Sequence, residues 1–90
     1  MRTPKYANEN PLDRLNHGEP YFFIRAQDRL SVQAVIEYSQ LLRYESVTAH
    51  ANEDYDLSDS LNKQADEVLE FAQKFKDWQK ENPEKVKFPD

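Results

Sequence analysis

The sequence predicts a mainly α-helical domain, and three observations support this prediction. Glycine occurs only once in 90 residues, which is too few for the tight turns of an all-β fold. Apolar residues recur at helical spacing over 32–45 and again over 58–82. One stretch, residues 21–26, has the composition of a strand. We therefore expect a short N-terminal helix, one extended segment and a two-helix hairpin that assembles into a homo-oligomer.

Residues 1–90 are expected to form a single domain that begins with a flexible arm over residues 1–9. Asn10 is a suitable N-cap and Pro11 suits the first helical position, so a short helix is predicted over 11–17. Gly18 would close this helix in the left-handed conformation. Residues 10–45 would thus hold the short helix, the extended segment and the first long helix.

The stretch from Tyr21 to Ala26 is aromatic and β-branched and follows a glycine and a proline, which favours an extended strand. The chain offers no second good strand. A single strand leaves its backbone groups unpaired, so either this strand pairs with another copy of the chain or the segment is not β.

Ser31 can cap a helix over 32–45, whose apolar face is wider than one partner helix covers. An acidic connector is expected over 46–57. A long helix then runs from Ser58 to Asn82, where a proline stops it, and residues 83–90 form an extended tail. The apolar seam of this long helix has spacings of four and three and comprises Leu61, Ala65, Val68, Ala72 and Phe75.

The charge pattern excludes several classes of partner. The net charge is −5, and residues 31–60 carry six acidic side chains and one basic side chain. Binding to duplex nucleic acid needs a basic face, which is not visible here. No apolar run approaches the ~20 residues of a membrane span, and we expect no secretory leader because the N-terminus lacks the apolar stretch of one. We therefore expect a soluble cytoplasmic protein that binds neither duplex nucleic acid nor membrane.

No pattern typical of an enzyme is present. His17 and His50 are isolated, and neither has a second histidine three or four residues away, as in a helical metal site. Cysteine is absent, and the single glycine cannot form a phosphate-binding loop. We expect no catalytic activity, no metal and no cofactor.

The most distinctive stretch runs from Tyr21 to Arg29. Aromatic rings beside a guanidinium and a carboxamide suit a nucleobase and its phosphate, because rings stack, an amide pairs with base edges and arginine binds phosphate oxygens. A structural role is the alternative: Arg25 would pair with Asp28, and Asp28 and Ser31 would hold the turn before the helix. The candidate ligand-binding residues are Tyr21, Phe23, Arg25, Gln27 and Arg29.

The segment from Gly18 to Leu42 resembles a group of small phage-encoded accessory proteins. Its residues Glu19–Leu30 fit their core, E-P-x-F-x-hydrophobic-R-A-x-D-x-L, which precedes a helix. Trp78 and the closing residues 88–90 are similar to that group's second helix and short tail. The acidic connector and Tyr38, where a tryptophan is expected, depart from the pattern. The resemblance implies a phage protein that acts in the host cytoplasm by binding host machinery or host defence components.

Together these observations favour a non-enzymatic protein that binds and sequesters a host-derived ligand at a site between subunits. A nucleotide-type immune signal best matches Arg25, Gln27 and the aromatic residues. The alternative is a protein-interaction module that inhibits a host enzyme through its acidic face, Glu53–Asp59.

Overall fold

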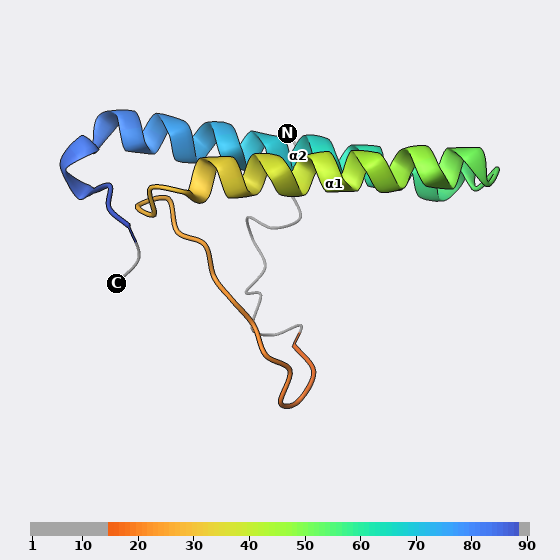
Figure 1. Ribbon diagram of the computed structural model, residues 1–90, viewed down its shortest axis with the longest axis horizontal. Coiled ribbons are helices and arrows are strands. Elements are labelled where there is room, and N and C mark those ends of the chain that lie inside the picture. The colour runs from red at the N-terminus through yellow and green to blue at the C-terminus, as the bar shows by residue number, and fades with distance from the viewer. Residues whose placement is uncertain (1–14, 89–90) are drawn as a thin grey trace, which may run out of the picture.

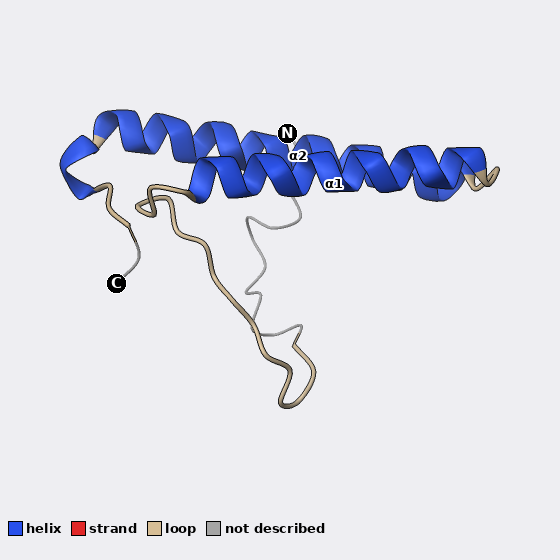
Figure 2. Ribbon diagram, in the orientation of Figure 1, coloured by secondary structure: helices blue, strands red, loops and turns tan. Residues whose placement is uncertain are grey.

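The computed structural model describes residues 15–88, which form two long antiparallel helices that lie side by side (Figure 1). Helix α1 spans Ser31–Ala51 and helix α2 spans Tyr55–Glu81. A short 3₁₀-helix, η2, follows at Pro83–Lys85. Figure 2 shows that the rest of the described chain is loop. The mainly helical class and the two-helix hairpin are confirmed.

The two helices meet along a seam of small and apolar side chains. The buried residues alternate at spacings of three and four, as in a coiled coil. Small side chains at these positions allow the two helices to approach closely. The seam predicted for the second helix is confirmed, since its three central members are buried, while Leu61 packs against the core and Phe75 is half-buried. The buried seam residues are Ser39, Leu42, Ser46 and Ala49 on α1 and Ser58, Ala65, Val68 and Ala72 on α2.

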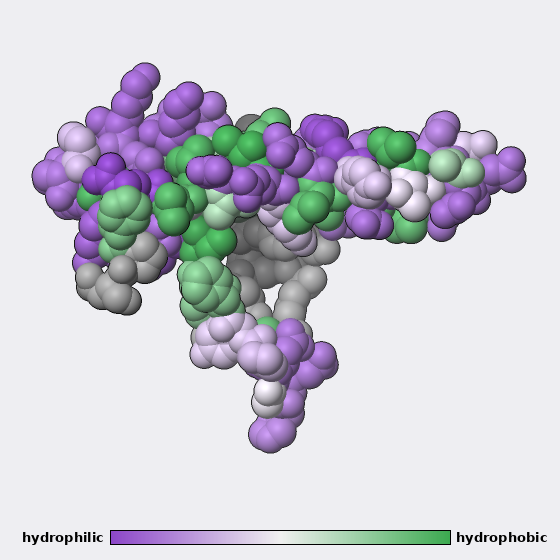
Figure 3. All heavy atoms as spheres, in the orientation of Figure 1, coloured by the Kyte–Doolittle hydropathy of each residue, from purple (hydrophilic) through white to green (hydrophobic). Residues whose placement is uncertain are grey.

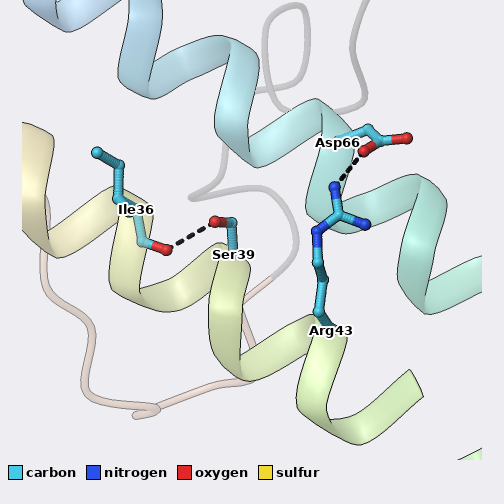
Figure 4. A network of polar contacts seen from close by, with 4 residues as sticks. All are labelled: Ile36, Ser39, Arg43 and Asp66. Atoms are coloured by element: carbon cyan, nitrogen blue, oxygen red, sulfur yellow. Dashed lines mark hydrogen bonds and ion pairs between the residues drawn. The ribbon is translucent and has the colours of Figure 1, made fainter. Parts of the chain in front are cut away.

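The buried serines find hydrogen-bond partners within the hairpin. Ser46 Oγ lies 3.0 Å from the carbonyl oxygen of Ser58 and 2.9 Å from its hydroxyl, so this pair joins the helices. Ser39 Oγ donates to the carbonyl oxygen of Ile36 at 2.6 Å (Figure 4). The same view shows Arg43 on α1 paired with Asp66 on α2. The seam therefore buries polar atoms without leaving them unpaired.

The connection between the helices is much shorter than the predicted acidic connector over 46–57. Helix α1 continues to Ala51 and ends in a Schellman motif, in which Glu53 N–H donates to His50 O at 3.0 Å and Asp54 N–H to Ala49 O at 2.9 Å. Asp54 Oδ1 then accepts from Leu57 N at 3.2 Å and caps α2. The predicted connector was wrong because buried small residues extend both helices into it. Asp54, expected in a loop, caps α2 instead.

Two further expectations about helix starts need correction. The N-cap of α1 is Leu30 and makes no side-chain capping bond, so Ser31 is the first helical residue rather than a cap. Helix α2 begins three residues before Ser58, which is buried in the seam. The predicted end near Asn82, before proline, agrees with the observed end at Glu81.

The segment 21–26 forms no strand. Among residues 15–88 the β-type pairing is limited to one isolated parallel bridge between Asp28 and Lys87. The flexible arm over 1–9 and most of the predicted helix over 11–17 lie outside the described residues. Gly18 lies in a turn with φ of 75°, the left-handed conformation expected of it.

Candidate ligand-binding cleft

The loop before α1, residues 19–30 and called the N-terminal loop below, is tied to the far end of α2 by one side chain. Gln79 Nε2 lies 2.9 Å from Ala26 O, 3.0 Å from Asp28 O and 3.1 Å from Ser31 Oγ. Ser31 is fully buried beneath this loop. Asp28 Oδ1 accepts from Leu30 N at 2.9 Å, which closes an Asx-type turn into α1. The loop thus has a fixed base.

The C-terminal segment, Val86–Phe88, lies beside the same loop. Lys87 N–H donates to Gln27 O at 2.9 Å, and Arg29 N–H donates to Lys87 O at 2.7 Å. The Arg29 guanidinium also lies over the Phe88 ring, 5.1 Å from its centroid. Residues separated by about sixty positions are therefore joined, because η2 turns the chain back toward the N-terminal loop (Figure 1).

A cleft of about 300 Å³ opens between the N-terminal loop and the C-terminal segment; we call it the tail cleft. Its lining combines three aromatic rings, two cations, one carboxamide and one carboxylate, which is a lining suited to a ligand with both a ring and an anionic group. The lining residues are Phe22, Phe23, Arg25, Gln27, Asp28, Lys87 and Phe88.

The structure brings three of the five candidate ligand-binding residues into this cleft, namely Phe23, Arg25 and Gln27. Tyr21 does not line the cleft but packs edge to face against Phe23, with 5.2 Å between ring centroids. Arg29 supports the opposite wall through its contact with Phe88.

The structure reproduces the turn of the structural alternative but not its Arg25–Asp28 pair. Within residues 15–88 no ion pair joins Arg25 to Asp28. Asp28 instead uses its side chain to accept the Leu30 amide, and Ser31 Oγ donates weakly to Ala26 O at 3.4 Å. Both residues hold the turn, while the Arg25 side chain is exposed and lines the cleft.

Sequence reasoning missed Phe22, Lys87, Phe88 and Gln79. Gln79 follows Ala72 and Phe75 at seam spacing, so a polar residue at the end of an apolar seam was the signal that could have found it. The residues of the C-terminal segment carried no comparable signal, because their position depends on a long-range backbone pairing.

Two further hollows lie between the N-terminal loop and the hairpin. Residues Ile24–Gln27 face Phe75 and Trp78 across a second hollow of about 370 Å³. Next to it lies a groove of about 200 Å³ with an almost wholly apolar lining. Figure 3 shows apolar side chains gathered where the loop meets the hairpin. The groove is lined by Ile24, Val35, Tyr38, Val68, Phe71 and Phe75.

The histidines and the potential metal ligands of the described chain form no cluster at the tail cleft. No cluster of three or more potential metal ligands occurs in the described part of the chain. His50 lies at the hairpin tip, far along α1 from the cleft, and packs edge to face on Tyr55 at 5.0 Å. His17 lies in an exposed turn. Neither histidine lines the tail cleft.

No described helix is both long enough and apolar enough to cross a lipid bilayer.

Comparisons of the chain with protein-family models, with curated proteins and with solved structures gave no match.

Proposed function

We propose that this chain is a non-enzymatic binding protein that sequesters a nucleotide-type ligand in the tail cleft. One observation carries the proposal: aromatic rings and cations line one cleft in a chain of net charge −5. Arg25 and Lys87 place two cations in the lining of this cleft against a single carboxylate, that of Asp28.

The binding mode follows from the chemistry of the lining. A nucleobase would stack on the ring of Phe23 or Phe88, both more than half exposed. The Arg25 guanidinium would bind phosphate oxygens with two parallel hydrogen bonds. The Gln27 carboxamide offers a donor and an acceptor for a base edge. In this proposal these residues bind and orient the ligand.

The resemblance to phage accessory proteins suggests where the ligand comes from. A protein that only binds acts by lowering the free concentration of its ligand, so we propose that the ligand is a host-derived signalling nucleotide. We also propose assembly into a homo-oligomer, in which Phe22 beside the cleft, 82% exposed, would contact a second subunit. The site would then lie at or near a subunit interface.

The alternative, inhibition of a host enzyme through the acidic face Glu53–Asp59, has less support. Asp54 caps α2 and Asp56 lies in its first turn, where a negative charge favours the helix. Helix capping therefore explains part of this acidity without a partner.

Substitution of Arg25 tests the proposal. We expect Arg25→Ala to weaken binding of cyclic dinucleotides or ADP-ribose by roughly 10- to 150-fold, since a charge-assisted hydrogen bond is lost. Arg25→Lys should also bind weakly, because an ammonium cannot reproduce the bidentate geometry. Titration calorimetry measures the affinity, and thermal melts followed by circular dichroism should stay unchanged.

Arg43→Ala is the matched control, because it removes an exposed arginine from α1 about three helical turns away from the loop. This variant should bind the nucleotides as the unaltered chain does. Equal affinity of Arg25→Ala and Arg43→Ala for every nucleotide would contradict the proposal.

A further inference from the structure

The C-terminal segment builds one wall of the tail cleft. Its backbone pairs with the N-terminal loop through both Lys87 groups, the amide at 2.9 Å and the carbonyl at 2.7 Å from their partners. The parallel bridge places the Lys87 and Phe88 side chains along the cleft that Arg25 and Gln27 line from the other side. Without this pairing only the N-terminal loop would remain, and an aromatic ring would have one wall to stack against.

The two residues bring different chemistry to this wall. Phe88 offers an aromatic ring, 60% exposed, which Arg29 supports at 5.1 Å from the centroid. Lys87 adds a second cation opposite Arg25. A ring and a cation therefore stand on each side of the cleft, a duplication that suits a ligand with two aromatic groups or two phosphates better than a mononucleotide.

We infer that Lys87 and Phe88 are specificity-determining residues of the tail cleft and select nucleotides that carry two aromatic bases or two phosphates. This inference rests on the proposed function and adds to it the second wall and the class of nucleotide. It also makes the backbone pairing of Lys87 a condition for tight binding, since the pairing positions both side chains.

Single substitutions separate the ring from the charge, with cyclic di-AMP and ADP-ribose as probes and adenosine as the uncharged fragment. Lys87→Ala should weaken both nucleotides about tenfold and leave adenosine unchanged, because the phosphate contact is lost while the stacking rings remain. Phe88→Ala should weaken nucleotides and adenosine alike, again about tenfold, because stacking is lost. Phe88→Tyr should restore binding.

A proline substitution tests the backbone pairing. Lys87→Pro removes the amide that donates to Gln27 O, and Val86 already has the extended backbone, φ −77° and ψ 127°, that a residue before proline requires. Its binding should fall below that of Lys87→Ala, which keeps the amide. Hydrogen exchange followed by NMR should show the Arg29 amide protected in Lys87→Ala and exposed in Lys87→Pro.

Lys85→Ala is the matched control, because Lys85 is exposed on η2 and does not line the cleft. It should bind every probe within twofold of the unaltered chain. Binding by Lys87→Ala and Phe88→Ala that equals this control would overturn the inference while leaving the proposed function in place. Failure of the unaltered chain to bind either nucleotide would contradict the proposed function, and the inference with it.

Discussion

At the scale of single residues, Gln79 is the side chain that holds the N-terminal loop of the candidate site against α2. Its amide group reaches three acceptors in the N-terminal loop and at the start of α1, which no other side chain of α2 does in the described part of the chain. These contacts span about fifty residues of sequence. Loss of the amide would remove one donor from each of the carbonyl oxygens of Ala26 and Asp28, which keep a second donor on Ser31, and one hydrogen bond contributes about 0.5–1.5 kcal/mol.

We expect Gln79→Ala to lower the free energy of unfolding by about 1–2 kcal/mol, because the three contacts are half-buried. Urea unfolding followed by circular dichroism measures this change. Gln73→Ala is the matched control, since Gln73 Nε2 donates to Asp77 Oδ1 at 2.9 Å on the exposed face of the same helix. Its effect should stay within about 0.5 kcal/mol. Equal effects of the two substitutions would show that Gln79 does not anchor the loop.

At the scale of elements, the hairpin is closed by a turn in which each residue has a defined role. Glu53 occupies the C′ position of the Schellman motif with φ of 62°, a conformation that favours glycine. The Asp54 backbone amide donates to the carbonyl oxygen of Ala49 in the last turn of α1, and the Asp54 carboxylate accepts from the Leu57 amide in the first turn of α2. The turn is therefore short, and both helices stay in register along the seam.

Glu53→Gly should raise the free energy of unfolding by about 0.5–1 kcal/mol, because glycine adopts positive φ without the steric cost of a side chain. Glu53→Val should lower it by about 1–2 kcal/mol, since a β-branched residue is poorly suited to this conformation. Thermal unfolding of both variants against the unaltered chain measures the difference. A stability order with valine above glycine would contradict the assigned turn.

The elements also show what the sequence could and could not predict. The α2 seam was predictable because its apolar spacing runs unbroken from Leu61 to Phe75. The last turns of α1 were missed because their buried positions are Ser46 and Ala49, which are too small or polar to be recognised as core. Residue types alone identified Phe23, Arg25 and Gln27 as a candidate site. The opposite wall depends on a contact between Gln27 and Lys87 that no local pattern encodes.

At the scale of the whole molecule, a hairpin of two helices leaves much apolar surface uncovered. Within residues 15–88 the core cluster consists of Leu42, Ala65 and Val68 with two neighbours packed against it, which is a small core for two helices of this length. On α1 the exposed apolar residues continue toward the hairpin tip, with Leu41 63% and Tyr44 71% exposed. A surface of this kind is typical of an interface, which is why we propose self-association.

Figure 1 shows the C-terminal segment and the start of α1 at the opposite end of the hairpin from the turn between α1 and α2. The acidic residues of that turn therefore lie far from the residues that line the tail cleft. This separation matters because repulsion between exposed charges fades within about 10 Å at ordinary ionic strength. A phosphate can therefore approach Arg25 although the chain as a whole is acidic.

Native mass spectrometry of the full chain, equilibrated with cyclic di-AMP or ADP-ribose, tests the central claim most directly. Its peaks report the number of chains in each assembly and the number of ligands held by each assembly. We expect assemblies of at least two chains with bound nucleotide, and loss of the nucleotide in the Arg25→Ala variant. Ligand-free peaks at every nucleotide concentration would contradict the binding claim, and a clean 10.7 kDa monomer would contradict the assembly.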